Sequence, residues 1–300
     1  MSRGHRWNAA YALAAAVVFV TYPASAIDSP EVLPSPTPPS GASGIDHASA
    51  SAYWAQGTPG PFAAGALEFG WAYARPRIAL GFGLPYHRYL SIEGQPLISP
   101  NGAGAYFGVK GAVPWLEMRV GTRYFAPFQR SLIRAKTTHN RLSIEEKDGP
   151  TASHAVLEAE MAGAVPVPGG GPFWVLSAYH IPDLQEGYHL YEESLKMVIE
   201  PPWVWRARVG YAVYFGKDDA ISVGLAQEVI VNPGRREHVL RAGVIANVHI
   251  NDTVDVQATF LPVLSSPDSI GLAGADFGHL GIRWRFATEP SKRRRRPTTR

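Results

Sequence analysis

The stretch that decides the fold is residues 277–286, which read FGHLGIRWRF. Its large apolar residues share one parity and its arginines share the other: Leu280, Ile282, Trp284 and Phe286 against Arg283 and Arg285. Alternate side chains of a β-strand point to opposite faces, so this segment has an apolar face and an arginine face. In a soluble sheet the apolar face is the core. In a barrel that crosses a membrane, the apolar face meets lipid and the arginines line the lumen.

The same period of two extends back along the chain as far as Phe62. The clearest alternating runs are 67–73, 78–84, 105–110, 116–124, 203–215, 221–231 and 240–248. Residues that favour tight turns separate several of them, as at Asn232-Pro233-Gly234. Prolines such as Pro76 and Pro127 are predicted to lie between strands, where no hydrogen bond of the sheet is lost. The runs number about thirteen, and single-chain bacterial barrels usually have an even number of strands, so about twelve strands are predicted, with ten or fourteen as alternatives. Segments 129–145 and 171–200 are the hardest to assign.

The first 26 residues have the three parts of a secretory signal. Arg3 and Arg6 precede the uncharged run Ala9–Val20, and Ala24-Ser25-Ala26 gives the small-x-small pattern that a signal peptidase accepts. As a helix, the run would span only about 18 Å of a hydrocarbon core of roughly 30 Å, which is too short for a permanent anchor. The sequence therefore predicts a signal peptide over 1–26, cleaved after Ala26, and export of the rest.

Composition marks two further boundaries. Residues 27–60 are rich in Pro, Ser, Gly and Ala, which predicts a disordered leader. Residues 287–300 contain Lys292 followed by four arginines, which predicts a basic disordered tail. The net charge is +3, and without those five charges it would be −2, so the body over 61–286 is not a basic surface for nucleic acid. The absence of cysteine excludes disulfides, thiolate metal sites and thiol catalysis.

With these features the chain resembles the outer-membrane β-barrel proteins of Gram-negative bacteria. It shares with them an export signal, alternating strands of about ten residues, aromatic residues near strand ends and a last strand that closes on Phe286. The resemblance implies an all-β fold, an antiparallel up-and-down transmembrane barrel over 61–286, in the bacterial outer membrane. It also implies two partners, the outer-membrane lipid and the assembly machinery that recognises a C-terminal strand. Phe286 departs from the pattern because 287–300 follow it.

Charged residues at lumen parity are the candidates for function. The predicted charge network comprises Glu68, Glu117, Arg119, Arg123, Glu158, Glu160, Arg206, Arg208, Glu228, Arg241, Arg283 and Arg285. With Lys110, Arg134, Lys136, Lys196, Glu192 and Asp255, this parity holds eleven bases against seven acids. Bases and acids of neighbouring strands could pair and fill the lumen, giving a structural or binding barrel or a narrow pore. Alternatively, the excess positive charge could line an anion-favouring channel or uptake porin. The small lumen of a barrel of about twelve strands favours the first interpretation.

The sequence gives little support to catalysis. A lipid-acting hydrolase would need a nucleophile beside a histidine, and the available pairs combine His180 or His189 with Ser177 or Ser194. The ten histidines show no metal-ligand spacing. We therefore expect no catalytic residue, no metal and no cofactor. A soluble exported β-sandwich is the remaining alternative fold, because its strands would also have one polar face.

A barrel also predicts which connections share an end. With a periplasmic C-terminus, the connections at 265–275 and 232–235 lie outside the cell, and those at 251–252 and 216–219 lie inside. The connections at 91–103 and 265–275 are predicted to be the long extracellular ones.

Overall fold

The computed structural model describes residues 53–70, 73–99, 102–128, 131–145, 150–165, 167–182, 184–216, 219–276 and 281–288. The predicted signal peptide (1–26), most of the leader (27–60) and most of the tail (287–300) lie outside these residues and stay predictions. Within the described ranges, no helix combines the length and the apolar character needed to cross a membrane.

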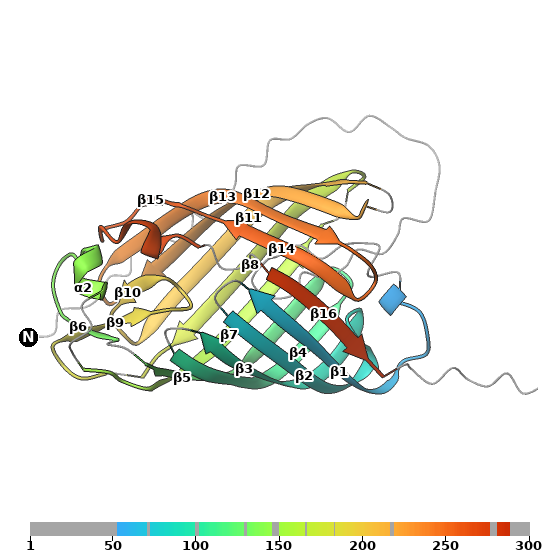
Figure 1. Ribbon diagram of the computed structural model, residues 1–300, viewed down its shortest axis with the longest axis horizontal. Helices are drawn as coiled ribbons and strands as arrows, with labels where there is room; N and C mark the ends of the chain where they lie inside the picture. Colours follow the sequence, from blue (N-terminus) through green and yellow to red (C-terminus); the bar gives the residue numbers. More distant parts are fainter. Residues whose placement is uncertain are drawn as a thin grey trace, which may run out of the picture. The chain divides into compact units, whose positions relative to one another are not determined.

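The structure is a closed antiparallel β-barrel of 12 strands (Figure 1). The strands are β1 (Gly60–Gly70), β2 (Tyr73–Leu84), β3 (Arg88–Ser99), β4 (Gly102–Val113), β5 (Leu116–Pro127), β7 (His154–Ala164), β8 (Gly170–His180), β11 (Trp203–Phe215), β12 (Ile221–Asn232), β13 (Glu237–His249), β14 (Val254–Phe260) and β16 (Gly281–Ala287). Beyond Leu261 and Pro262, the short β15 (Val263–Ser265) continues the line of β14 along β13. The prediction of a barrel with twelve strands is confirmed.

The arginine strand quoted first closes the barrel. In Figure 1, β16 lies between β14 and β1, and it pairs with β1 in the register Glu68↔Arg283 and Phe69↔Ile282. Residues 277–280 of that stretch lie outside the described ranges. Because the first and last strands pair, the sheet has no free edge, and the β-sandwich alternative is wrong.

Apolar side chains cover the outside of the barrel. On β12 every outward residue from Ile221 to Gln227 is exposed and every inward one is buried, and Leu225 is 70% exposed. The outward side chains of the other strands include Ile92, Phe107, Tyr211, Val244 and Trp284, each at least 42% exposed. An apolar outer face with a polar interior is the pattern of a barrel in lipid.

Long connections gather at one end of the barrel. They follow β5, β8 and β15, and they form β6 (Leu132–Arg134), α2 (Arg141–Glu145), β9 (Tyr188–Glu192), β10 (Met197–Ile199) and the 3-10 turn η3 (Gly271–Gly274). β9 pairs with both β6 and β10. We call β6, β9, β10 and the 193–196 turn the loop plug.

The loop plug packs on inward-facing apolar side chains at the mouth of the barrel. Its members in this apolar cluster are Leu132, Leu190, Leu195, Met197 and Ile199, each at most 3% exposed. The barrel residues beneath them come from β7, β8, β11, β12 and β13: Val156, Tyr179, Val204, Ile230 and Val239. One continuous apolar cluster therefore spans the mouth on this side of the barrel.

The opposite end has short turns and a segment lying against it. Trp54 is buried, packs against Tyr86 with the two rings tilted at 4.8 Å between centroids, and donates from its indole nitrogen to the carbonyl of Asp252 at 3.1 Å. Trp54 lies within 27–60, the range predicted from composition to be a disordered leader. In the structure, chain preceding the first strand is held against this end.

Two sequence predictions about strands are wrong. Residues 91–103 are not a long connection, because β3 runs to Ser99 and β4 starts at Gly102. The outward face of β3 includes Gly94 and Pro96, and its buried inward residues Ser91, Glu93 and Gln95 are polar, so the apolar alternation of this strand is weak in the sequence. Pro76 and Pro127 were predicted to lie between strands, but they lie within β2 and at the end of β5.

Candidate functional site

Buried ion pairs inside the barrel form the candidate site, and the densest group surrounds Glu228. Arg208, on the neighbouring strand β11, donates to the Glu228 carboxylate at 2.5 and 2.9 Å. Arg241, on β13, donates to its other oxygen at 2.7 Å. The register Arg208↔Glu228↔Arg241 puts the three side chains in one row across three strands. None is more than 2% exposed, so charge is matched by direct contact without much water.

Connections that fold inward complete this group. Arg208 also contacts Asp276, in the connection to β16, at 2.5 Å. Arg241 donates to the backbone carbonyls of Leu195 and Lys196, in the loop plug, at 2.6 and 3.1 Å. The plug is therefore tied to the lumen wall by charge-assisted hydrogen bonds as well as by apolar packing.

A second group crosses β5, β7 and β11. Glu160 lies within 3.2 Å of Arg119 and 2.8 Å of Arg206, and accepts a hydrogen bond from Ser177 at 3.2 Å. Glu158, two residues away on the same face of β7, lies 3.2 Å from Arg123. Arg119 is 3.6 Å from Glu158 and so bridges the two carboxylates.

The strand that closes the barrel supplies a third group. Arg283 and Arg285 both bind Asp255 of β14, Arg283 at 2.7 Å. His249 of β13 lies 3.5 Å from the same carboxylate. Asp255 is fully buried, so one carboxylate accounts for both arginines of the deciding segment.

The wall formed by β1 to β5 is arranged differently. Glu68 pairs with Arg75 at 2.6 Å, and Lys110 pairs with Glu117 at 2.8 Å. Glu93 is 1% exposed, yet neither carboxylate oxygen has a hydrogen-bond partner in the described part of the chain.

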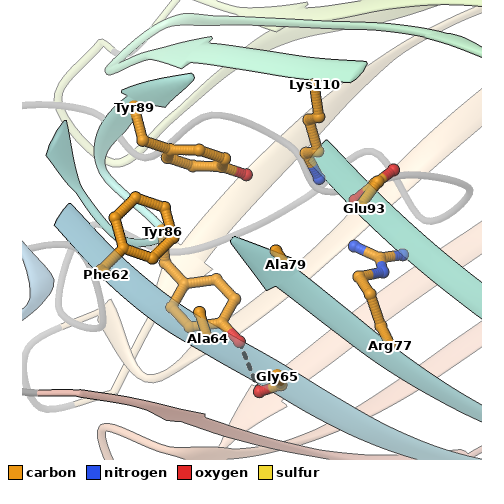
Figure 2. Close-up of a pocket in the computed structure, with 9 residues that line it drawn as sticks. All are labelled: Phe62, Ala64, Gly65, Arg77, Ala79, Tyr86, Tyr89, Glu93 and Lys110. Atoms are coloured by element: carbon orange, nitrogen blue, oxygen red, sulfur yellow. Dashed lines mark hydrogen bonds between the residues drawn. The ribbon is translucent and has the colours of Figure 1, made fainter. Parts of the chain in front are cut away.

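Figure 2 shows the surroundings of Glu93. Its carboxylate lies between the Lys110 ammonium and the Arg77 guanidinium, and the Tyr89 hydroxyl points toward the same space. These side chains line a cavity of about 10 Å³. At the edge of the cavity, the Tyr86 hydroxyl donates a hydrogen bond to the Gly65 carbonyl. That volume holds one water molecule, which could bridge the carboxylate and the cations.

The structure revises the predicted lumen charge. Arg134 and Lys136 are exposed on the loops, and Lys196 pairs with Glu193 there, so none of the three lines the barrel wall. Four further charged residues face the lumen and were not predicted from the sequence: Arg75, Arg77, Glu93 and Asp276. Pro76 indicated a strand boundary within β2, which excluded Arg75 and Arg77. Glu93 was assigned to a connection, and Asp276 does lie in a connection. Among the described residues the wall then has ten bases against seven acids, and Glu192 and Asp276 reach in from the connections to bind Arg123 and Arg208. With these two carboxylates counted, the predicted excess of four positive charges falls to one.

One serine and one histidine come together on a shared carboxylate. Glu192 of β9 accepts from Ser194 at 2.7 Å and lies 2.9 Å from the Nε2 atom of His154. Arg123 contacts Glu192 at 3.1 Å. Burial alone would raise the pKa of Glu192, but Arg123 and His154 outweigh it and hold the pKa below its usual range. A hydrolase needs the histidine between serine and acid. Here the acid lies between the other two, so His154 is not placed to deprotonate Ser194.

A last polar group joins the loops to each other. Arg235, in the turn between β12 and β13, binds Asp268 at 2.6 and 2.9 Å and donates to the carbonyls of Val198 and Thr137. His139 donates its backbone N–H to Asp268 at 2.8 Å, and its ring contacts the ring of His189 at 3.0 Å. The connections after β5, β8 and β15 therefore meet at one point above the plug.

A closed antiparallel barrel with a lipid-like outer face and a charged interior defines a class, the outer-membrane β-barrel proteins of Gram-negative bacteria. No protein-family model matches the sequence, and no curated protein sequence matches it. Similar solved structures are an outer-membrane channel from Pseudomonas putida F1 (8% identity, 78% of this chain and 96% of the other, TM-score 0.44), the porin NanC (7%, 76% and 97%, 0.35) and the translocator domain of the autotransporter NalP from Neisseria meningitidis (11%, 76% and 85%, 0.30). At these TM-scores the similarities say nothing about what this chain transports or binds.

Proposed function

We propose that the protein is an outer-membrane barrel whose lumen is closed at rest, a structural or binding barrel and not a constitutively open pore. The observation that carries the proposal is the loop plug. Leu190, Leu195 and Ile199 are at most 1% exposed and pack on side chains of five lumen-wall strands. Apolar side chains across a narrow mouth oppose the passage of ions, because they offer no hydration.

The ion pairs below the plug support the same function. Arginine side chains reach across to neighbouring strands and to the loops, so they occupy space that a solute would need. The anion-favouring alternative depended on an excess of four positive charges. The described groups that face the lumen, with Glu192 and Asp276 from the connections included, are ten bases and nine acids, so the electric field that would select anions is weak.

The setting of this barrel is also part of the proposal. We place it in the bacterial outer membrane after cleavage of the predicted signal peptide, with lipid against its apolar face. The assembly machinery would recognise the C-terminal strand, which has alternating apolar residues up to Phe286. We propose no enzymatic activity and no nucleic-acid partner.

Conductance in planar bilayers tests the proposal. The full-length protein, purified in detergent and shown to be folded by its mobility on unheated gels, should give almost no current at pH 7.5. A variant in which a Gly-Ser linker replaces 184–199 lacks β9 and β10 and should give discrete current steps. The control variant replaces α2, whose Leu142 is 73% exposed, with the same kind of linker and should remain silent.

Two results would contradict the closed barrel. Steady currents from the wild-type protein at pH 7.5 would show that the plug does not seal the lumen. A folded variant without β9 and β10 that remains silent would show that the plug is not what closes it.

A further inference from the structure

Two histidines from different connections meet at the top of the loop plug. His139 precedes α2, and His189 lies on β9. The Nε2 atom of His139 is 3.0 Å from the Nδ1 atom of His189, and the rings meet edge to face. The two residues are 2% and 7% exposed.

Two carboxylates and two cations surround the pair. Asp268 faces His139 but is bound by Arg235 through both carboxylate oxygens. Glu200 lies 3.9 Å from the Nε2 atom of His189, beyond hydrogen-bonding distance. Arg235 and Lys136 add positive charge on the same side. Asp268 and Glu200 favour a positive charge on the pair, but burial and the nearby cations outweigh them.

The geometry of the contact allows one bridging proton. A neutral pair puts one N–H opposite one lone pair, which is an ordinary hydrogen bond. When both rings are protonated, two N–H groups and two positive charges face each other at 3.0 Å. The remaining ring nitrogen of His139, Nδ1, is buried without a hydrogen-bond partner among the described residues, so a proton there would be left unsatisfied.

We propose that the His139–His189 contact is a proton-operated latch, which fastens the connection after β5 onto β9 at neutral pH and releases it as the pH falls. The inference rests on the proposed closure of the lumen by these loops. Near His139, the connection after β15 is held by a backbone hydrogen bond from Ser269 to the His139 carbonyl at 2.8 Å, so release would loosen this connection as well.

The direction of the pH dependence follows from burial. Burial lowers the pKa of His139 to about 4, and burial likewise lowers the pKa of His189. Released loops expose histidines to water with an ordinary pKa near 6.5, so the released state binds more protons between those values. The free-energy preference for the latched state is therefore complete above about pH 6.5 and decreases as the pH falls toward 4. At pH 5.5, His139 alone shifts the equilibrium about tenfold toward release.

Hydrogen exchange of the folded full-length protein in detergent tests the latch. Peptides that cover β6 and β9 should show about tenfold more opening at pH 5.5 than at pH 7.5, after correction for the intrinsic pH dependence of exchange. In His139→Gln and His189→Gln this pH response should largely disappear. His238 is exposed at the same end of the barrel, so His238→Gln should respond like the wild type.

Equal protection of β6 and β9 at the two pH values would overturn the latch, as would an undiminished response in both glutamine variants. Should those variants fail to fold, the wild-type comparison decides alone. Conductance recorded in parallel separates the two proposals. Current at pH 7.5 with β9 protected refutes the closed barrel and leaves the latch standing. Silence at pH 7.5 without any pH response refutes the latch only.

Discussion

Glu228 and Glu93 are equally buried, at 1% exposure, but the walls around them differ. Glu228 is bound by Arg208 and Arg241 at 2.5 to 2.9 Å. Glu93 lies between Arg77 and Lys110 without a direct hydrogen bond among the described residues, beside a cavity of about 10 Å³.

The difference follows from where the connections fold. The wall of β11 to β13 receives Asp276 and the carbonyls of residues 195 and 196 from connections that enter the mouth. These contacts fix Arg208 and Arg241 against Glu228. At the mouth, β3 ends at Ser99 and β4 starts at Gly102, so only two residues join them, and the apolar contacts of the loop plug lie on β7, β8 and β11 to β13. The arginines beside Glu228 are therefore held by groups from the loops as well as by the carboxylate, whereas Glu93 has no such contact among the described residues.

The largest expected effect comes from removing Glu228. In Glu228→Ala, Arg208 and Arg241 lose the carboxylate that they share, at 2% exposure, and the free energy of unfolding should fall by about 3–5 kcal/mol. The matched variant Glu93→Ala removes an equally buried carboxylate that makes no direct hydrogen bond, and it should cost less than about 1 kcal/mol. Urea unfolding in detergent micelles measures both values.

Equal losses in the two variants would remove the distinction between the walls. A large loss in Glu93→Ala alone would show that bridging water holds Glu93 as firmly as direct contact would. In either case the ion-pair groups would need to be treated as one network.

The second prediction concerns the outer faces of the same two walls, which should behave alike. Leu225 on β12 and Ile92 on β3 are 70% and 54% exposed at mid-strand. Leu225→Arg and Ile92→Arg should each cost about 2–4 kcal/mol in lipid vesicles, because both put a charge near the middle of the bilayer. Val231 lies outward on β12 beside the turn, and Val231→Arg should cost about 0–1 kcal/mol. Arginine tolerated equally well at all three positions would argue against a membrane setting.

Much of this structure could be predicted from alternation alone. The outward and inward parities of β4, β5, β11, β12, β13 and β16 follow from a period of two, and so does the presence of Arg283 and Arg285 in the lumen. β3 was missed because Gly94 and Pro96 interrupt its outward apolar face, so the strand has no strong period in the sequence. Arg75 and Arg77 were missed with it, because Pro76 indicated a boundary that the strand does not have.

The site was less predictable than the wall. The partners of Arg208 and Arg241 include residues of the connections, and local sequence does not indicate whether a connection folds inward or away. The contact between His139 and His189 joins residues separated by 50 positions in the sequence. Only the long sequence between β5 and β7, and between β8 and β11, could have indicated that such loops exist.

The last prediction concerns which end of the barrel faces the outside of the cell. The plug end carries the long connections, and long connections of outer-membrane barrels usually face outward. The chain has no cysteine, so a single introduced cysteine reports its own position. Leu142 of α2 and Asp252 of the turn between β13 and β14 are exposed at opposite ends. Ser269 would be a poor choice, because its backbone bonds to His139 and Arg141 hold the latch region. A membrane-impermeant maleimide on intact cells should label Leu142→Cys and spare Asp252→Cys until the cells are lysed. The reverse pattern would place the plug in the periplasm, and a latch there would respond to periplasmic pH.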